Sequence, residues 1–493
     1  MSRARRMLAV LCLLQLLPHA QAAEPPTVAV VPAQPTDTLE AGLQRVVDEA
    51  LVANLDLRAA GSSVQQRLAA LDQARARYLP VIDFAARYSV ADGGRTIEFP
   101  VGDLLNPVYA TLDEMLLAQG EPARFPRVRN ESIALLREEE QETKLVLEQP
   151  IYEPRIGPAV AASRANAARA EADLAALRSQ VIRDVKQAYY RWIAAEQAVA
   201  VLDATLAATR ENLRANQSLY RNGKVTRDLV YRAEADVLEI EQDRLATASR
   251  TRIAQSYVNL LRNAPLDQPL PVATLDADTI ERFRARLLAV LAGRQVNLRQ
   301  LQDVASQRRQ ELQSLDSAIA VGEAQQDLAR AAFKPSLAFG AEAGIQGTEY
   351  GFADEDRYVL ASLVLRFNAF RGGADQAALR EARAFTDSLR ANRELAGQRV
   401  RLEVQQALEN FGVAEASLDT AAKRAEAASG AFTIISRKRD LGQVNQAEFI
   451  DARRAQTDAQ LNVTRVRAEY LARLAELEFS IGDARRMDQE QRR

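Results

Sequence analysis

The feature that most constrains this sequence is a long heptad-spaced pattern that occurs twice, at positions 219 residues apart. In the first copy, small and apolar side chains recur from Val181 to Tyr220 with spacings that alternate between four and three residues. The second copy runs from Val400 to Arg439 and keeps this character except near its final turn. A period of 3.5 residues sustained over this length predicts long helices that supercoil left-handedly along narrow seams. Because only 5% of the residues are aromatic, we do not expect one large aromatic-rich core.

A glycine follows each copy of the pattern at the same offset, and a further helical stretch follows each glycine. Glycine readily adopts the left-handed backbone conformation that a tight helix reversal needs. We therefore predict two long antiparallel helical hairpins, at about 159–263 and 373–481. The tips of these hairpins are Gly223-Lys224-Val225 and Gly442-Gln443-Val444.

Two other helical stretches, 255 residues apart, end at a proline and lead into alternating segments. Proline cannot continue a helix, so Pro80 and Pro335 mark the change. An alternation of apolar and polar side chains with period two is typical of half-buried strands. Four strands are too few to close a barrel, so we expect several copies of the chain to complete one. The alternating segments lie at about 81–91, 143–152, 336–346 and 358–368.

Short motifs occur in a fixed order around these predicted helices and strands. They are Leu39-Glu40-Ala41, Tyr78-Leu79-Pro80, Gln149-Pro150-Ile151-Tyr152, Phe333-Lys334-Pro335, Gly442-Gln443-Val444 and Phe449-Ile450-Asp451-Ala452-Arg453. In this order they resemble the TolC-like outer-membrane efflux protein family, over nearly all of the chain that follows residue 22. The resemblance implies a mainly α-helical protein with a β-barrel. Each subunit of a homotrimer gives four strands to a shared outer-membrane barrel and two hairpins to a long periplasmic coiled-coil tube.

The same resemblance implies a function and a set of partners. Such proteins are exit ducts of tripartite efflux or type I secretion systems. They sit in outer-membrane lipid and receive substrates from an inner-membrane pump, of the resistance-nodulation-division or the ABC type, through a periplasmic adaptor protein. We expect the hairpin tips to contact the adaptor. The duct is shared by the two kinds of system, so the sequence leaves both open.

Two acidic residues, Glu448 and Asp451, lie three apart on the helix after the second tip and can face the same way. The resemblance implies that three subunits place six such carboxylates in a ring that constricts the periplasmic entrance of the pore. The alternative is that Asn445 and Glu448 form a capping box, since acidic residues in a first helical turn are favoured without any pore. The first repeat has Leu229 and Arg232 at the corresponding positions, so the ring would depend on one hairpin.

The first 22 residues carry a basic start, an apolar stretch and Ala20-Gln21-Ala22, which predict a secretory signal peptide. The chain's only cysteine and only histidine, Cys12 and His19, both lie in it. After cleavage we expect no disulfide, no Cys or His metal site and no His-dependent catalytic triad. The sequence also lacks phosphate-binding loop patterns, so we expect no enzyme and no cofactor. A net charge of −2 does not favour a nucleic-acid partner.

The remaining organisation follows from the two offsets. We expect an extended lead-in at 23–38, a first structural repeat at 39–264, a second at 265–482 and a charged tail at 483–493. The offset between the two repeats falls from 255 residues at the prolines to 219 at the hairpins. The first repeat therefore holds 255 − 219 = 36 additional residues between these two points. We place them between its two strands, in a long loop at 92–142. We expect a surface loop folded on itself, with a short helix ending near Leu117. A lid over the barrel mouth is the alternative, since the long loops of such barrels are external.

One other class of protein has to be weighed. A periplasmic coiled-coil scaffold or adaptor without a barrel would explain the heptads and the signal peptide. It would not explain four alternating segments or their placement after prolines. A scaffold should leave the cell envelope with salt or osmotic shock, whereas a barrel trimer needs detergent. A secreted hydrolase has no residues to support it.

Overall fold

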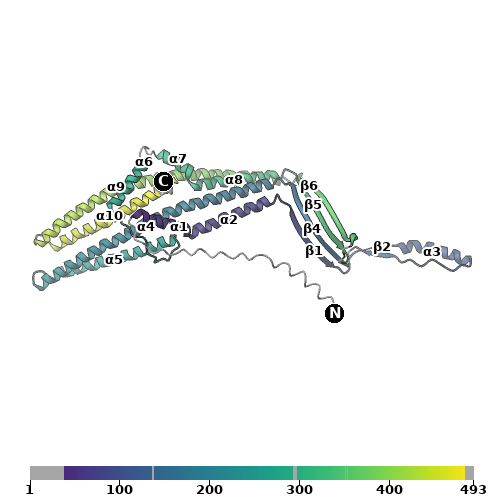
Figure 1. Ribbon diagram of the computed structural model, residues 1–493, viewed down its shortest axis with the longest axis horizontal. Coiled ribbons are helices and arrows are strands. Elements are labelled where there is room, and N and C mark those ends of the chain that lie inside the picture. Colours follow the sequence, from purple (N-terminus) through teal and green to yellow (C-terminus); the bar gives the residue numbers. More distant parts are fainter. Residues whose placement is uncertain (1–37, 136–137, 292–296, 350, 352, 483–493) are drawn as a thin grey trace.

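The computed structural model describes residues 38–135, 138–291, 297–349, 351 and 353–482. The predicted signal peptide, nearly all of the lead-in and the charged tail lie outside the described residues. The molecule is strongly elongated, with the tips of two helical hairpins at one end and a four-stranded sheet toward the other (Figure 1). A thin projection that contains helix α3 extends beyond the sheet, away from the hairpins (Figure 1). The chain therefore places its helical and its sheet surfaces at opposite ends.

Two very long helices run the length of the helical body. Helix α4 has 66 residues and α9 has 67. At ~1.5 Å per residue each is roughly 100 Å long. Each turns back into a shorter partner, and shorter helices lie alongside the remainder. The helices of the body are α1 Leu39–Ala53, α2 Leu55–Ala76, α4 Ile156–Arg221, α5 Arg227–Leu261, α6 Ala277–Leu291, α7 Leu298–Arg308, α8 Gln310–Ala331, α9 Ala374–Asp440 and α10 Gln446–Ile481.

The heptad seams are buried where the two halves of the chain meet. Val185 and Val404, which correspond across the repeat, are both fully buried. Val185 lies in the largest core cluster, which gathers residues of α1, α4, α9 and α10, among them Tyr189 and Tyr470. Val404 packs in a separate cluster, with Ala305 of α7 and Leu312 of α8. Burial raises the pKa of the Tyr470 hydroxyl to about 12, so this core phenol stays neutral. The seam thus joins both halves of the chain into one helical body.

The sheet is antiparallel, with strand order β1-β4-β5-β6. Its register sets Ile82, Leu147, Ala341 and Ala361 side by side across the four strands. Strands β1 and β6 are the edges, and within one chain each has a neighbour on one side only. The mainly helical fold with antiparallel strands is as predicted. The strands are β1 Val81–Val90, β4 Glu139–Tyr152, β5 Ser336–Gly347 and β6 Arg357–Arg366.

The long loop between β1 and β4 differs from the expectation. It does fold back on itself, but it stands out beyond the sheet as a projection. A two-stranded ribbon of β2 Thr96–Phe99 and β3 Glu131–Ala134 forms its base, and helix α3 Val101–Ala118 forms its body. The helix begins earlier than expected, since it continues through Pro107. A proline inside a helix removes one hydrogen bond, which is why the sequence suggested a later start.

Candidate functional site

The sheet has one polar face, on which charged side chains of three strands interact. Lys144 Nζ lies 3.0 Å from a carboxylate oxygen of Glu142 on its own strand and 3.3 Å from one of Glu342 on β5. From β1, Arg87 lies 3.3 Å from Glu142. The pairing register places these residues on the same side of the sheet. This face can therefore remain hydrated, with its charges joined in one network of salt bridges.

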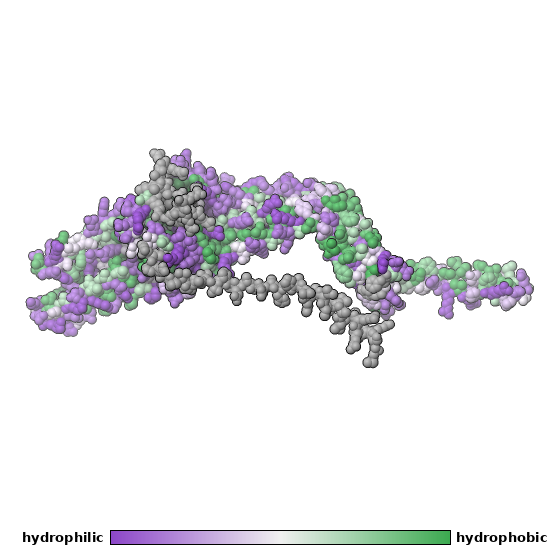
Figure 2. All heavy atoms as spheres, viewed as in Figure 1, coloured by the Kyte–Doolittle hydropathy of each residue, from purple (hydrophilic) through white to green (hydrophobic). Residues whose placement is uncertain are grey.

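The opposite face of the sheet is apolar and exposed. Phe84 is 71% exposed and Val359 is 81% exposed, although a folded chain in water would bury both. Figure 2 shows the sheet as a predominantly apolar surface, in contrast to the mixed surface of the helices. A contiguous exposed apolar surface marks an interaction site. Other exposed members of this face are Ile82, Tyr88, Val90, Leu145, Leu363 and Leu365.

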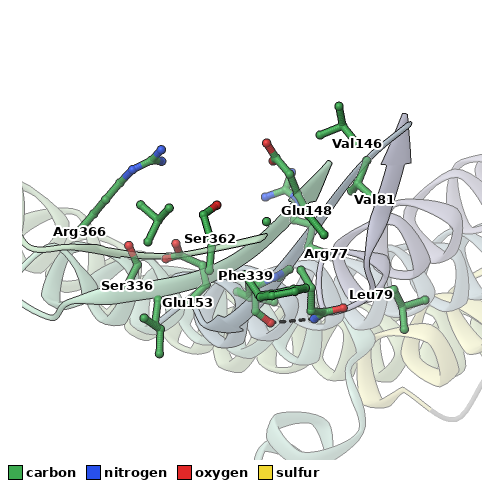
Figure 3. A pocket seen from close by; sticks show the side chains of 18 of the residues that line it. Arg77, Leu79, Val81, Val146, Glu148, Glu153, Ser336, Phe339, Ser362 and Arg366 are labelled. Atoms are coloured by element: carbon green, nitrogen blue, oxygen red, sulfur yellow. Dashed lines mark hydrogen bonds between the residues drawn. The ribbon is translucent and has the colours of Figure 1, made fainter. Parts of the chain in front are cut away.

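A hollow of about 640 Å³ lies where the sheet meets the helices. Charges of both signs line it, including Arg77, Glu153 and Arg366. Figure 3 shows Glu148 of β4 and Ser362 of β6 pointing to the same side of the sheet. The hollow is thus a continuation of the polar face toward the helical body.

The two hairpin tips are built alike. Gly223 and Gly442 have φ values of +66° and +71°, in the left-handed region that favours glycine. In each tip the residue after the glycine donates its backbone N–H to a carbonyl five residues back, at 2.9 Å for both Lys224 and Gln443. This is the Schellman arrangement that ends a helix at a glycine. Lys224 and Gln443 are exposed, and the two tips lie at the outer end of the helical body (Figure 1).

Glu448 and Asp451 lie just beyond the second tip, and both are exposed in the single chain. The Asn445 side chain accepts a hydrogen bond from the backbone N–H of Glu448 at 2.9 Å, so the capping interaction is present. Asp451 takes no part in this cap. In the first repeat, Arg232 lies 4.0 Å from Asp228 on its own helix. The cap and an acidic ring are therefore compatible, because the cap uses the backbone N–H of Glu448 and not its carboxylate.

A buried ion pair, which the sequence analysis missed, joins the two hairpins. Asp236 of α5 and Arg453 of α10 are 2% and 3% exposed, and their side chains form a salt bridge. Burial raises the pKa of the Asp236 carboxyl, an effect that Arg453 opposes. Both residues occupy heptad positions, with Ala233 and Ile240 around one and Ile450 and Thr457 around the other. Extending the heptads into the returning helices would have revealed charges on the seam.

Comparisons with known proteins agree with this geometry. Residues 301–483 match the model of the Outer membrane efflux protein family. The matched segment runs from α7 to the end of α10, over less than half of the chain. No curated protein matches the chain.

Solved structures of outer-membrane proteins share the fold of this chain. The CmeC outer membrane channel of Campylobacter jejuni has 17% identity and a TM-score of 0.70, over 92% of this chain and 88% of that one. The open-state MtrE channel of Neisseria gonorrhoeae has 19% identity and a TM-score of 0.67, over 90% and 89%. VceC of Vibrio cholerae, an outer membrane protein, has 15% identity and a TM-score of 0.69, over 90% and 96%. Of the helices that the structure describes, none is both long and apolar enough to span a membrane.

Proposed function

We propose that this chain is the outer-membrane channel of a tripartite efflux or type I secretion system, an exit duct that extends into the periplasm. The observation that carries the proposal is the sheet, with one continuous apolar face, one polar face and two open edges. An apolar face of this size suits hydrocarbon, and a face of paired charges suits a water-filled lumen. The helical body, with its mixed polar surface, suits the periplasm. Substrates would leave through the lumen.

The open edges of the sheet require neighbouring subunits. Hydrocarbon offers no hydrogen-bond partners, so strands that cross a bilayer must pair in a closed ring. Four strands cannot close such a ring. The resemblance to the TolC-like family implies a homotrimer, and three copies give twelve strands. In this arrangement β1 of one subunit pairs with β6 of the next.

We expect the protein to stay in the membrane fraction after washing with salt or after osmotic shock, and to be released only by detergent. In mild detergent its measured mass, after subtraction of the bound detergent, should be that of three chains. Light scattering with size-exclusion chromatography makes this measurement. Release by salt, or a mass of one or two chains, would contradict the proposal and favour a periplasmic scaffold.

We further propose that the hairpin tips contact a periplasmic adaptor protein, which connects the channel to an inner-membrane pump of the resistance-nodulation-division or ABC type. The tip residues concerned are Gly223, Lys224, Val225, Gly442, Gln443 and Val444. They are supported as a contact site by their place at the end farthest from the sheet (Figure 1).

A photocrosslinking side chain at Lys224 or at Gln443 should capture a coexpressed adaptor. The same side chain at Lys334, an exposed residue at the sheet end of the helical body, should capture none. Gel analysis of the irradiated complex measures the difference. Equal capture from all three positions, or labelling of the tips from outside intact cells, would contradict the proposed contact.

We also propose that Glu448 and Asp451 form the pore constriction. A ring of six carboxylates favours cations through its local potential, so the double variant Glu448→Gln/Asp451→Asn should lose cation preference and block by multivalent cations in bilayer conductance measurements. The matched control is Asn445→Ala, which removes the cap at a cost of about 1 kcal/mol but keeps both carboxylates. The control should retain cation preference. If the double variant also retains cation preference, the proposed ring is wrong and the helix cap is the remaining role of this segment.

A further inference from the structure

The projection beyond the sheet uses one side of α3 to hold its own return segment at 119–130. Asn106 donates a side-chain hydrogen bond to the Val128 carbonyl at 2.8 Å and accepts one from the Val128 N–H at 2.9 Å. Farther along, Asp113 accepts a hydrogen bond from the backbone N–H of Arg124 at 2.8 Å. Between these contacts the rings of Tyr109 and Phe125 stack at 5.1 Å. This side of α3 is therefore already occupied.

A second side of α3 carries an apolar stripe that stays largely exposed in the described part of the chain. Val108 is 54% exposed and Met115 is 57% exposed, and Leu104 beside them is 70% exposed. Figure 2 shows apolar side chains gathered along one side of the projection. The stripe has spacings of four, three, four and three residues, which is the seam of a coiled coil. Its members are Val101, Leu105, Val108, Leu112 and Met115.

The stripe lies outside the membrane. Strands that span a bilayer need about 9 to 11 residues, and β1 and β4 already have 10 and 14. The projection continues from the far ends of these strands (Figure 1), so α3 stands in water. Most of the stability of a helix in a protein comes from packing of its apolar face, and the return segment packs against a different side of the 18-residue α3. A lipid tail cannot supply that packing there, but another protein surface can.

Other copies of this chain are the occupants that the structure favours. The projection rises between β1 and β4, and β1 is the edge strand at which the next subunit of the proposed trimer begins. Three projections then stand at one end of a closed ring, side by side and parallel. We propose that the α3 helices of three subunits pack through the stripe from Val101 to Met115 into a parallel three-helix coiled coil at the external mouth of the channel. This inference rests on the proposed trimeric function.

Single cysteines test the packing, because the chain's only cysteine lies in the predicted signal peptide. Under mild oxidation, Met115→Cys should give disulfide-linked dimers on a denaturing gel. The matched control is Glu114→Cys, which lies on the neighbouring exposed position about 100° around the helix. Met115→Cys should give roughly tenfold more dimer than Glu114→Cys, because a disulfide needs Cα atoms within about 7 Å. Leu112→Cys, one step along the stripe, should behave like Met115→Cys.

The outcomes separate this inference from the function on which it rests. A detergent-solubilised trimer in which neither Met115→Cys nor Leu112→Cys crosslinks, or in which Glu114→Cys crosslinks equally well, overturns the coiled coil and leaves the channel intact. A monomer in detergent overturns both proposals. Crosslinking from the two stripe positions alone supports the coiled coil.

Discussion

Asp236→Asn is expected to destabilise the helical body by about 3–5 kcal/mol, the usual cost of removing one partner of a buried ion pair. Burial alone favours a neutral side chain at this position, as the raised pKa of Asp236 indicates. The guanidinium of Arg453, however, cannot lose its proton and is 3% exposed. Its charge would remain without a counterion between α5 and α10. Thermal unfolding of the detergent-solubilised protein, followed by circular dichroism, measures the loss.

The same two helices supply the control for this variant. Arg454 and Glu239 pair across α10 and α5, but their side chains are 47% and 50% exposed. Exposed pairs contribute at most about 1 kcal/mol, so Glu239→Gln should change little. The double variant Asp236→Leu/Arg453→Met replaces both buried partners, and it should recover most of the stability that Asp236→Asn loses. If Asp236→Asn costs no more than Glu239→Gln, the buried pair does not hold the hairpins together.

Gly344→Val should prevent the sheet from forming. A Cβ atom at Gly344 would lie 2.5 Å from the carbonyl oxygen of Thr143 and 2.7 Å from Cβ of Lys144 on the paired strand. The oxygen belongs to the backbone, so relief requires β4 and β5 to separate. We expect the free energy of unfolding to fall by about 3 kcal/mol or more, which is the upper end of the range for overpacked sites. Immunoblots of outer-membrane fractions without heating should show the trimer greatly reduced.

Gly340→Ala serves as the control on the same strand and the same face of the sheet. Its new methyl group would meet only the hydroxyl of Ser362, at 3.1 Å. A serine side chain can rotate away, so the trimer should persist. If Gly344→Val assembles as well as Gly340→Ala, then β4 and β5 do not approach as closely in the membrane as in this fold.

The sequence predicted best those features that repeat with a local period. The heptads placed the seam through Val185 and Val404 because burial of one helix face imposes a spacing of 3.5 residues. The hairpin tips could be predicted from their glycines, because a tight helix reversal needs a residue in the left-handed backbone conformation. Both signals are carried by neighbours in the chain, and neither depends on how distant segments meet.

Other features lacked such a local signal. The start of α3 was obscured by Pro107, which a helix tolerates here at the loss of one hydrogen bond. The pairing of Asp236 with Arg453 depends on the contact between two helices far apart in sequence. In the sequence these two charged residues look like residues on a solvent-exposed helix face. The proposed closure of a barrel depends on contacts between several chains, since the sheet of one chain ends in open edges at β1 and β6.

The uneven lengths of the paired helices have a mechanical consequence. Helix α4 continues for 66 residues, whereas the layer beside it is divided among separate helices, with α5 ending at Leu261 and α2 beginning at Leu55. An uninterrupted helix bends little, because bending it sharply requires its hydrogen-bond ladder to break. A sideways force on a hairpin tip is therefore transmitted along α4 to the gap between α5 and α2. There the side chain of Asn54 donates a hydrogen bond to the carbonyl of Leu261 at 2.7 Å, so we expect the hairpin of α4 and α5 to pivot about this junction.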